Sequence, residues 1–240
     1  MFSRKILLII AAVFVLLALS LYFFGRKKPS RTATTTPDQQ SEVSSSLIPS
    51  LNQGLITVPV RASDEDIQKA FSEFTSKKPT KPLESSKITD SKNKPLSLDK
   101  FTQAVGVKLK PQLRGLLDTS DYELFVCNDA GKADYGIIIT VRLLPDYGGN
   151  LYQDELKFMR AWESSLFKDT AKIIFPNFNF TEEQLGQTVI FEDGTCRYAN
   201  VVLPDNTSGS INYDLVDDYV IISSSKDCLG KASEYVFSSD

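Results

Sequence analysis

The chain has 240 residues, a formal net charge of −3 at pH 7 and no histidine. It therefore has no imidazole for acid–base catalysis, for Ser-His-Asp or Cys-His nucleophile systems, or for most zinc and iron sites. The charge is unevenly distributed, with a net of +6 over residues 26–110 and −11 over residues 111–240. Because contacts to phosphates need a basic surface, the acidic C-terminal part argues against nucleic-acid binding.

The first predicted element is an apolar helix. Nineteen uncharged residues, Ile6 to Phe24, lie between Arg4-Lys5 and Arg26-Lys27-Lys28. As a helix this stretch rises about 28 Å, close to the thickness of the hydrocarbon core of a bilayer. Only a helix satisfies its own backbone in that environment, so we expect a single transmembrane span that contacts the lipid bilayer. A signal peptide cleaved after Ala18-Leu19-Ser20 is the alternative, although the stretch is longer than a usual signal core.

The orientation of this span stays open. Positive charges flank it on both sides, and the larger cluster, which includes Arg31, lies on the C-terminal side. By the positive-inside rule, that count slightly favours a cytoplasmic C-terminal domain. Residues 25–54 are rich in Ser, Thr, Pro and Gln, so we expect a disordered spacer that reaches roughly 30 Å from the membrane.

A small strand–helix unit is predicted next. Leu55–Val60 is typical of an edge strand because it contains Pro59. Ser63 is a helix N-cap followed by three acidic residues, and an apolar stripe of helical spacing continues to about Ser76. Residues 77–96 are polar and rich in Pro and Lys, which indicates a hinge with one short strand at 86–89.

The main predicted domain starts at the N-cap Ser97 and continues with a short helix over 111–117. Strands at 122–127 and 134–143 are expected to form a hairpin, and Asn150 is expected to cap the longest helix, which ends near Ile174. Thr181 has the pattern of a further N-cap. The remaining predicted elements are strands at 188–192, 197–203, 211–215 and 219–224 and a last helix at 226–236 after Ser225.

This order of elements predicts an α+β fold in which an antiparallel sheet has its helices packed on one face. Parallel βαβ units are not favoured, because most connections between strands are too short. The predicted segments are a tail at 1–5, a transmembrane helix at 6–24, a spacer at 25–54, a strand–helix unit and hinge at 55–96, and a soluble α+β domain at 97–240.

The three cysteines have no metal-binding spacing. Outside the cytoplasm, one disulfide and one buried thiol would be the natural arrangement. Cys196 and Cys228 lie outside the apolar pattern of their neighbours, so we expect these two to pair and Cys127 to be a buried thiol.

One acidic cluster has a candidate chemistry. Asp214, Asp217 and Asp218 lie between two predicted strands, and neighbouring carboxylates can act as acid and base or hold a divalent cation. A charged turn that keeps an exposed hairpin soluble is the more frequent origin of such a cluster. No other catalytic, cofactor or metal site is predicted.

The order of features resembles a family of uncharacterised, membrane-anchored proteins of ultrasmall candidate-phylum bacteria. The residues that carry the resemblance are the apolar span and spacer, Ile48-Pro49, Leu55–Val60, Ser63–Glu73, Leu117–Val126, Met159 to Glu163, and Ile221-Ile222 with the serines that follow. The resemblance implies a single-pass protein whose α+β domain lies outside the cytoplasm. It implies no catalytic residues.

The sequence therefore predicts a membrane-anchored, non-enzymatic interaction or assembly module of the cell envelope, with a protein as its partner. Two alternatives stay open. One is an envelope enzyme that uses the acidic cluster, with or without a divalent cation. The other is an adaptor that faces the cytoplasm, which the basic residues after the span favour and which an intact disulfide would exclude.

Overall fold

The computed structural model describes residues 54–107, 109, 111, 115–129, 131–141 and 151–237. The predicted span at 6–24, the spacer up to residue 53, the cap Asn150 and residues 112–114 of the short helix predicted at 111–117 lie outside these residues. That helix does not extend to residue 117 as predicted, because residues 115 and 116 form a turn and Leu117 begins a strand. Within the described ranges, no helix is both long enough and apolar enough to span a bilayer.

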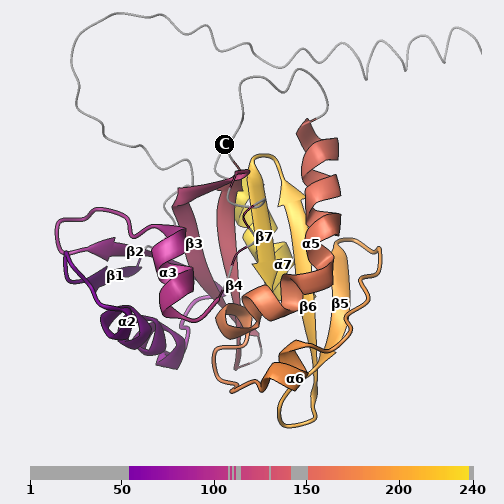
Figure 1. The fold of residues 1–240 in the computed structure, drawn as a ribbon, viewed down its shortest axis with the longest axis horizontal. Coiled ribbons are helices and arrows are strands. Elements are labelled where there is room, and N and C mark those ends of the chain that lie inside the picture. Colours follow the sequence, from indigo (N-terminus) through magenta and orange to yellow (C-terminus); the bar gives the residue numbers. More distant parts are fainter. Residues whose placement is uncertain are drawn as a thin grey trace, which may run out of the picture. The chain divides into compact units, whose positions relative to one another are not determined.

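The α+β prediction is confirmed, because the described strands form one mixed, mostly antiparallel sheet (Figure 1). Its order is β1-β2-β3-β4-β7-β6-β5. The strands are β1 (Gly54–Val58), β2 (Leu83–Asp90), β3 (Leu117–Asp129), β4 (Lys132–Val141), β5 (Arg197–Val202), β6 (Ser208–Val216) and β7 (Tyr219–Ser223). The helices are α2 (Asp64–Ser76), α3 (Leu98–Ala104), α5 (Leu151–Ile174), α6 (Glu182–Leu185) and α7 (Lys226–Phe237).

Three predicted helix caps are confirmed. The Ser63 hydroxyl accepts from the Asp66 N–H, and the Asp66 carboxylate accepts from the Ser63 N–H, which is a capping box at the start of α2. Ser97 caps α3, and Thr181 forms a capping box with α6. These caps are local interactions, which is why their residues were visible in the sequence.

The N-terminal unit is part of the sheet, which corrects two predictions. Segment 83–90, expected to be a hinge with a short strand, forms β2, and Leu83 to Ser86 pair with β3. In addition, β1 and β2 are parallel neighbours joined through α2, so the chain contains a βαβ unit that the sequence did not favour. Residues 59–82 between the two strands are long enough for a crossover with a helix, which parallel pairing requires.

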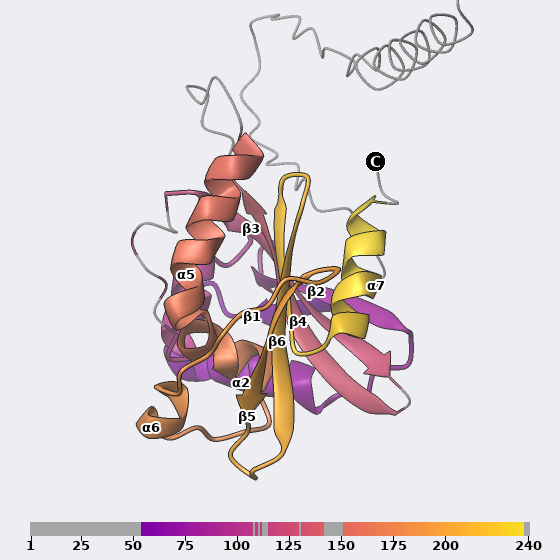
Figure 2. The ribbon, with the colours of Figure 1, turned by 90° about the vertical axis from the view of Figure 1, so that its right-hand side faces the viewer.

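Helices cover both faces of the sheet, whereas the sequence predicted one face. Figure 2 shows α5 on one side of the strands and α7 on the other. Residues of α2, α3 and α5 share one core with the sheet, and residues of α7 share a second core on the opposite face. The physical reason is the composition of the central strands, since Ile137–Ile139 of β4 and Val220–Ile222 of β7 are apolar at consecutive positions and so present apolar side chains on both faces.

The disulfide prediction was wrong, because Cys228 is bonded to Cys127 with a Cα–Cα distance of 5.6 Å. Cys127 of β3 is directed to the α7 face, and Cys228 lies in the first turn of that helix, so the two meet in one core. Cys196 is the free thiol and is half-buried just before β5. Burial raises the pKa of the Cys196 thiol, which keeps this thiol neutral at pH 7.

The strand predicted at 188–192 does not form, although the chain runs along β5 there. Glu192 and Tyr198 exchange backbone hydrogen bonds of 2.8 and 3.2 Å. The Gln187 side-chain amide accepts from the Val202 N–H and donates to the Val202 carbonyl. The Gln187 side chain and the single Glu192–Tyr198 bridge thus make hydrogen bonds that a neighbouring strand would otherwise make, and they cover part of the edge of β5.

Candidate functional site

The structure does not gather the predicted acidic cluster into a metal site. Asp214 lies within β6 opposite Ile221, whereas Asp217 and Asp218 form the β6–β7 turn, where Asp217 has a φ of 49°. Burial raises the pKa of the Asp214 carboxyl, whose oxygen accepts from the Leu215 N–H. No group of three or more potential metal-binding side chains occurs among the described residues.

A second group of charges lies on the α7 face, across β2, β3 and β4. Lys87 Nζ is 3.0 Å from Asp121 Oδ1 and 3.6 Å from Glu123 Oε1, and Thr140 Oγ1 donates to Asp121 Oδ2. Glu123 is fully buried. Burial raises the pKa of the Glu123 carboxyl, and the negative charge of Asp121 acts in the same direction. The group is a structural ion-pair network in the sheet, and it lines none of the described cavities.

This buried carboxyl predicts a pH dependence of stability. Its pKa is higher in the folded than in the unfolded chain, so its contribution to stability is complete below the unfolded value and is lost as the pH rises through the folded value. We therefore expect Glu123→Gln to match the wild type near pH 4 and to become progressively more stable than the wild type toward pH 8. Urea unfolding of both proteins across this range measures the difference.

Glu84 provides a matched control, because its pKa is shifted in the opposite direction from that of Glu123. Burial alone would raise the pKa of the Glu84 carboxyl, but hydrogen bonds donated by Thr80 and Lys81 outweigh it and lower the pKa. Its contribution is therefore present above the unfolded pKa and lost as the pH falls. Glu84→Gln should lose stability at neutral pH and approach the wild type in acid. Parallel curves for both variants would contradict the assignment.

A third group joins α5 to the β5–β6 hairpin. The Arg197 guanidinium donates through Nε and Nη2 to the two carboxylate oxygens of Glu163, at 2.9 and 2.8 Å. The Tyr213 hydroxyl donates to Glu163 Oε1 at 2.6 Å, and Arg197 Nη1 donates to Asp193 at 2.8 Å. All three guanidinium nitrogens of Arg197 donate to carboxylates of the protein, so this group holds the hairpin against α5 and positions its far end.

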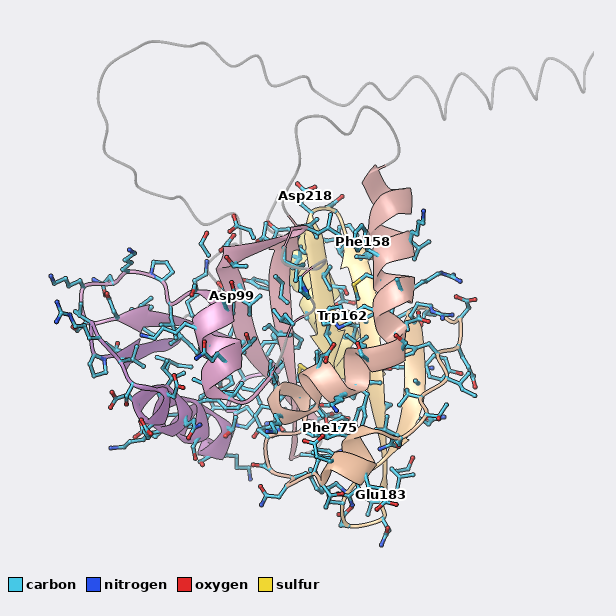
Figure 3. The ribbon with its side chains drawn as sticks, in the orientation of Figure 1. Asp99, Phe158, Trp162, Phe175, Glu183 and Asp218 are labelled. Atoms are coloured by element: carbon cyan, nitrogen blue, oxygen red, sulfur yellow. A yellow bond between two sulfur atoms is a disulfide. The ribbon has the colours of Figure 1, made fainter. Side chains whose placement is uncertain are left out.

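That far end forms the largest described cavity, about 540 Å³, which we call the β7 cleft. It exists because β7 stops at Ser223, while its neighbours β4 and β6 continue. Figure 2 shows the β5–β6 hairpin extending well past the start of α7. The cleft and the acidic turn lie at opposite ends of the sheet, as the labels of Phe175, which lines the cleft, and Asp218 show in Figure 3.

One edge of the β7 cleft is the beginning of β4. The Tyr135 N–H donates to Ser224 Oγ at 3.0 Å, and the Tyr135 carbonyl accepts from the Ser224 N–H at 3.0 Å. Peptide groups alternate in direction along a strand. Those of Ala133, two residues earlier, are therefore directed to the same side, into the cleft, which Ala133 lines.

The other edge of the β7 cleft is the beginning of β6. The Leu203 N–H donates to the Thr207 carbonyl at 2.9 Å, which continues the register of the β5–β6 pair. Odd-numbered residues of β6 thus bond to β5, and the peptide groups of Ser208 and Ser210 are directed to the cleft. The two edges are separated by about two strand spacings, or roughly 9.6 Å.

The floor of the cleft comes from the end of α5 and the loop after it. Phe175 and Phe178 lie on the α5 face of the sheet and line the cleft. The Tyr135 hydroxyl donates to the Thr75 carbonyl at 2.6 Å, so it ties β4 to the end of α2 beside this loop. Ser225 closes the inner end, where its hydroxyl caps α7 by accepting from the Cys228 N–H.

Sequence reasoning missed the β7 cleft entirely. Its residues are common types without a motif, and the gap depends on the pairing of strands that are far apart in the chain. The local signal available was the serine run at 223–225, which marks where β7 gives way to α7. The chain matches no family model, curated protein or solved structure.

Proposed function

We propose that the chain is a membrane-anchored, extracytoplasmic interaction module of the cell envelope that acts without catalysis and binds a protein partner. The predicted span at 6–24 supplies the anchor, and the spacer at 25–54 lets the domain reach away from the bilayer. The observation that carries the proposal is the β7 cleft, because its lining of backbone, hydroxyl and amide groups suits recognition of a partner chain.

The Cys127–Cys228 disulfide supports the extracytoplasmic side. It joins β3 to α7 inside a buried core, and such structural disulfides persist in oxidising compartments and are rare in the cytosol. The acidic surface expected of residues 111–240 supports it further, since a domain of this charge is repelled by anionic headgroups and stands away from them.

Two measurements on the native host test this location. Protease added to cells stripped of their outer layers should cleave the domain while a cytoplasmic marker stays intact. Maleimide labelling of the denatured chain should modify one cysteine before reduction and all three after it, because Cys196 is the free thiol. Cys196→Ser is the matched control and should show no labelling before reduction. Full protection from protease, or three reactive thiols without reductant, contradicts the proposal.

A further inference from the structure

We infer that the β7 cleft binds an extended segment of a partner protein as an additional strand, with one apolar side chain inserted between Ala133 and Leu203. This inference rests on the proposed function, because it names the chemistry of the partner at the same cleft. The segment would continue the line of β7 beyond the point where the chain turns into α7.

The backbone geometry carries the first part of this inference. Peptide groups of Ala133 on one side and of Ser208 and Ser210 on the other are directed into the cleft, and the edges are about two strand spacings apart. No strand of the described chain lies between them. A single extended polypeptide fits this gap and bonds to both edges at once, which is the principle of β-strand addition. Ser224 already takes the first such position, because it bonds to Tyr135.

The side-chain geometry carries the second part. Gly136 of β4 and Asn212 of β6 both pair with Ser223 of β7. Ala133 lies three residues before Gly136, and Gly209 lies three residues before Asn212. Ala133 and Gly209 therefore lie in the same row across the cleft, both on the α5 face. Leu203 packs over Gly209, at 3.1 Å from where a Cβ atom would be, and Phe178 lies on the same face. These small and apolar groups leave room for one apolar side chain of the incoming segment.

The charged groups at the cleft favour main-chain recognition over recognition of an ion. Lys132 Nζ is 3.5 Å from the buried Asp134 carboxylate. The Asp205 carboxylate accepts from the Thr207 hydroxyl and N–H at 2.6 and 3.0 Å, which lowers the pKa of the Asp205 carboxyl. Since Lys132 already faces the Asp134 carboxylate and the Asp205 carboxylate already accepts two hydrogen bonds from Thr207, the directed peptide groups and the apolar row decide what the cleft accepts.

Short random peptides displayed on phage, selected against the full-length chain in lipid nanodiscs, test the inference. We expect enriched peptides to share one apolar residue with polar neighbours. Ala133→Phe fills the apolar row and should weaken binding of an enriched peptide more than about tenfold. Ser208→Pro removes an N–H directed to the cleft at the first position of a strand, where proline is tolerated, and should weaken binding as well.

Val202→Phe is the matched control, because this β5 side chain is 56% exposed, does not line the cleft and should leave binding unchanged. Circular dichroism confirms that each variant is folded, and if Ala133→Phe is not, Ser208→Pro decides. Absence of enriched peptides, or equal binding by wild type and both cleft variants, overturns the inference.

Amide hydrogen exchange distinguishes a partner segment from two other possible occupants of the cleft, which are the chain's own spacer and a second copy of the chain. Bound peptide should protect the amides of Ala133, Ser208 and Ser210. Protection in the free chain that disappears when residues 25–53 are deleted would assign the cleft to the chain's own spacer. Protection that grows with protein concentration would assign it to a second copy, and either result overturns the inference.

A domain that protease places outside but that binds no peptide leaves the proposed function standing, whereas a domain protected from protease overturns that function regardless of peptide binding.

Discussion

Replacing Cys127 and Cys228 together by alanine should lower the free energy of unfolding by about 4–5 kcal/mol. The bond closes a loop of 101 residues that includes β4, α5, β5, β6 and β7. In the chain-entropy model, removing the link restores conformational freedom to the unfolded state in proportion to the logarithm of the loop length. Guanidinium unfolding of the two proteins measures the loss, and reductant should give the wild type the same lowered midpoint.

Cys196→Ser is the control for this experiment, because Cys196 forms no disulfide and is half-buried at the edge of the second core. Its substitution should change the unfolding free energy by less than about 1 kcal/mol. If Cys196 were instead the partner of Cys228, as the sequence suggested, this variant would lose stability and Cys127→Ser would not. The comparison thus decides between the two pairings.

Arg197→Met is expected to lower the free energy of unfolding by about 2–3 kcal/mol. It leaves the Glu163 carboxylate half-buried with the Tyr213 hydroxyl but without its cation. Breaking a fully buried pair costs about 3–5 kcal/mol, and the 14% and 16% exposure of these two side chains reduces the loss. Thermal and denaturant unfolding both report this loss.

Arg160→Met provides the contrast. Arg160 reaches Asp193 at 3.4 Å with both side chains exposed, and surface pairs of this kind contribute under about 1 kcal/mol. The double variant Glu163→Met with Arg197→Met should recover much of the loss of Arg197→Met, because no unpaired charge remains. Equal losses in Arg197→Met and Arg160→Met would refute a role for the Glu163–Arg197 pair in holding the hairpin.

Most helices and strands were predictable from the sequence because their signals are local. Caps at Ser63, Ser97 and Thr181 and the apolar spacing of α5 placed the helices, and the polar connection at 128–133 placed the β3–β4 hairpin. The strand predicted at 188–192 failed because a strand needs a bonded neighbour, and here one bridge and the Gln187 amide take that place.

The candidate site could not be predicted, because none of its properties belongs to a single segment. The β7 cleft requires that β4 and β6 flank β7, that β7 stop first, and that Ala133 and Gly209 share a row. These residues are 76 positions apart in the sequence and carry no reactive group. The acidic run that did attract attention lies at the other end of the sheet.

The sequence by itself determined the absence of histidine chemistry, the charge asymmetry, the apolar stretch at 6–24 and the α+β class, since composition and short-range periodicity carry them. Only the tertiary structure decided that Cys127 rather than Cys196 pairs with Cys228, that β1 and β2 are parallel, that α7 covers the second face, and that a cleft opens beside β7. Each of these depends on contacts between distant segments, whose formation follows from burying apolar surface on both faces of the sheet and is not encoded in any one stretch of the chain.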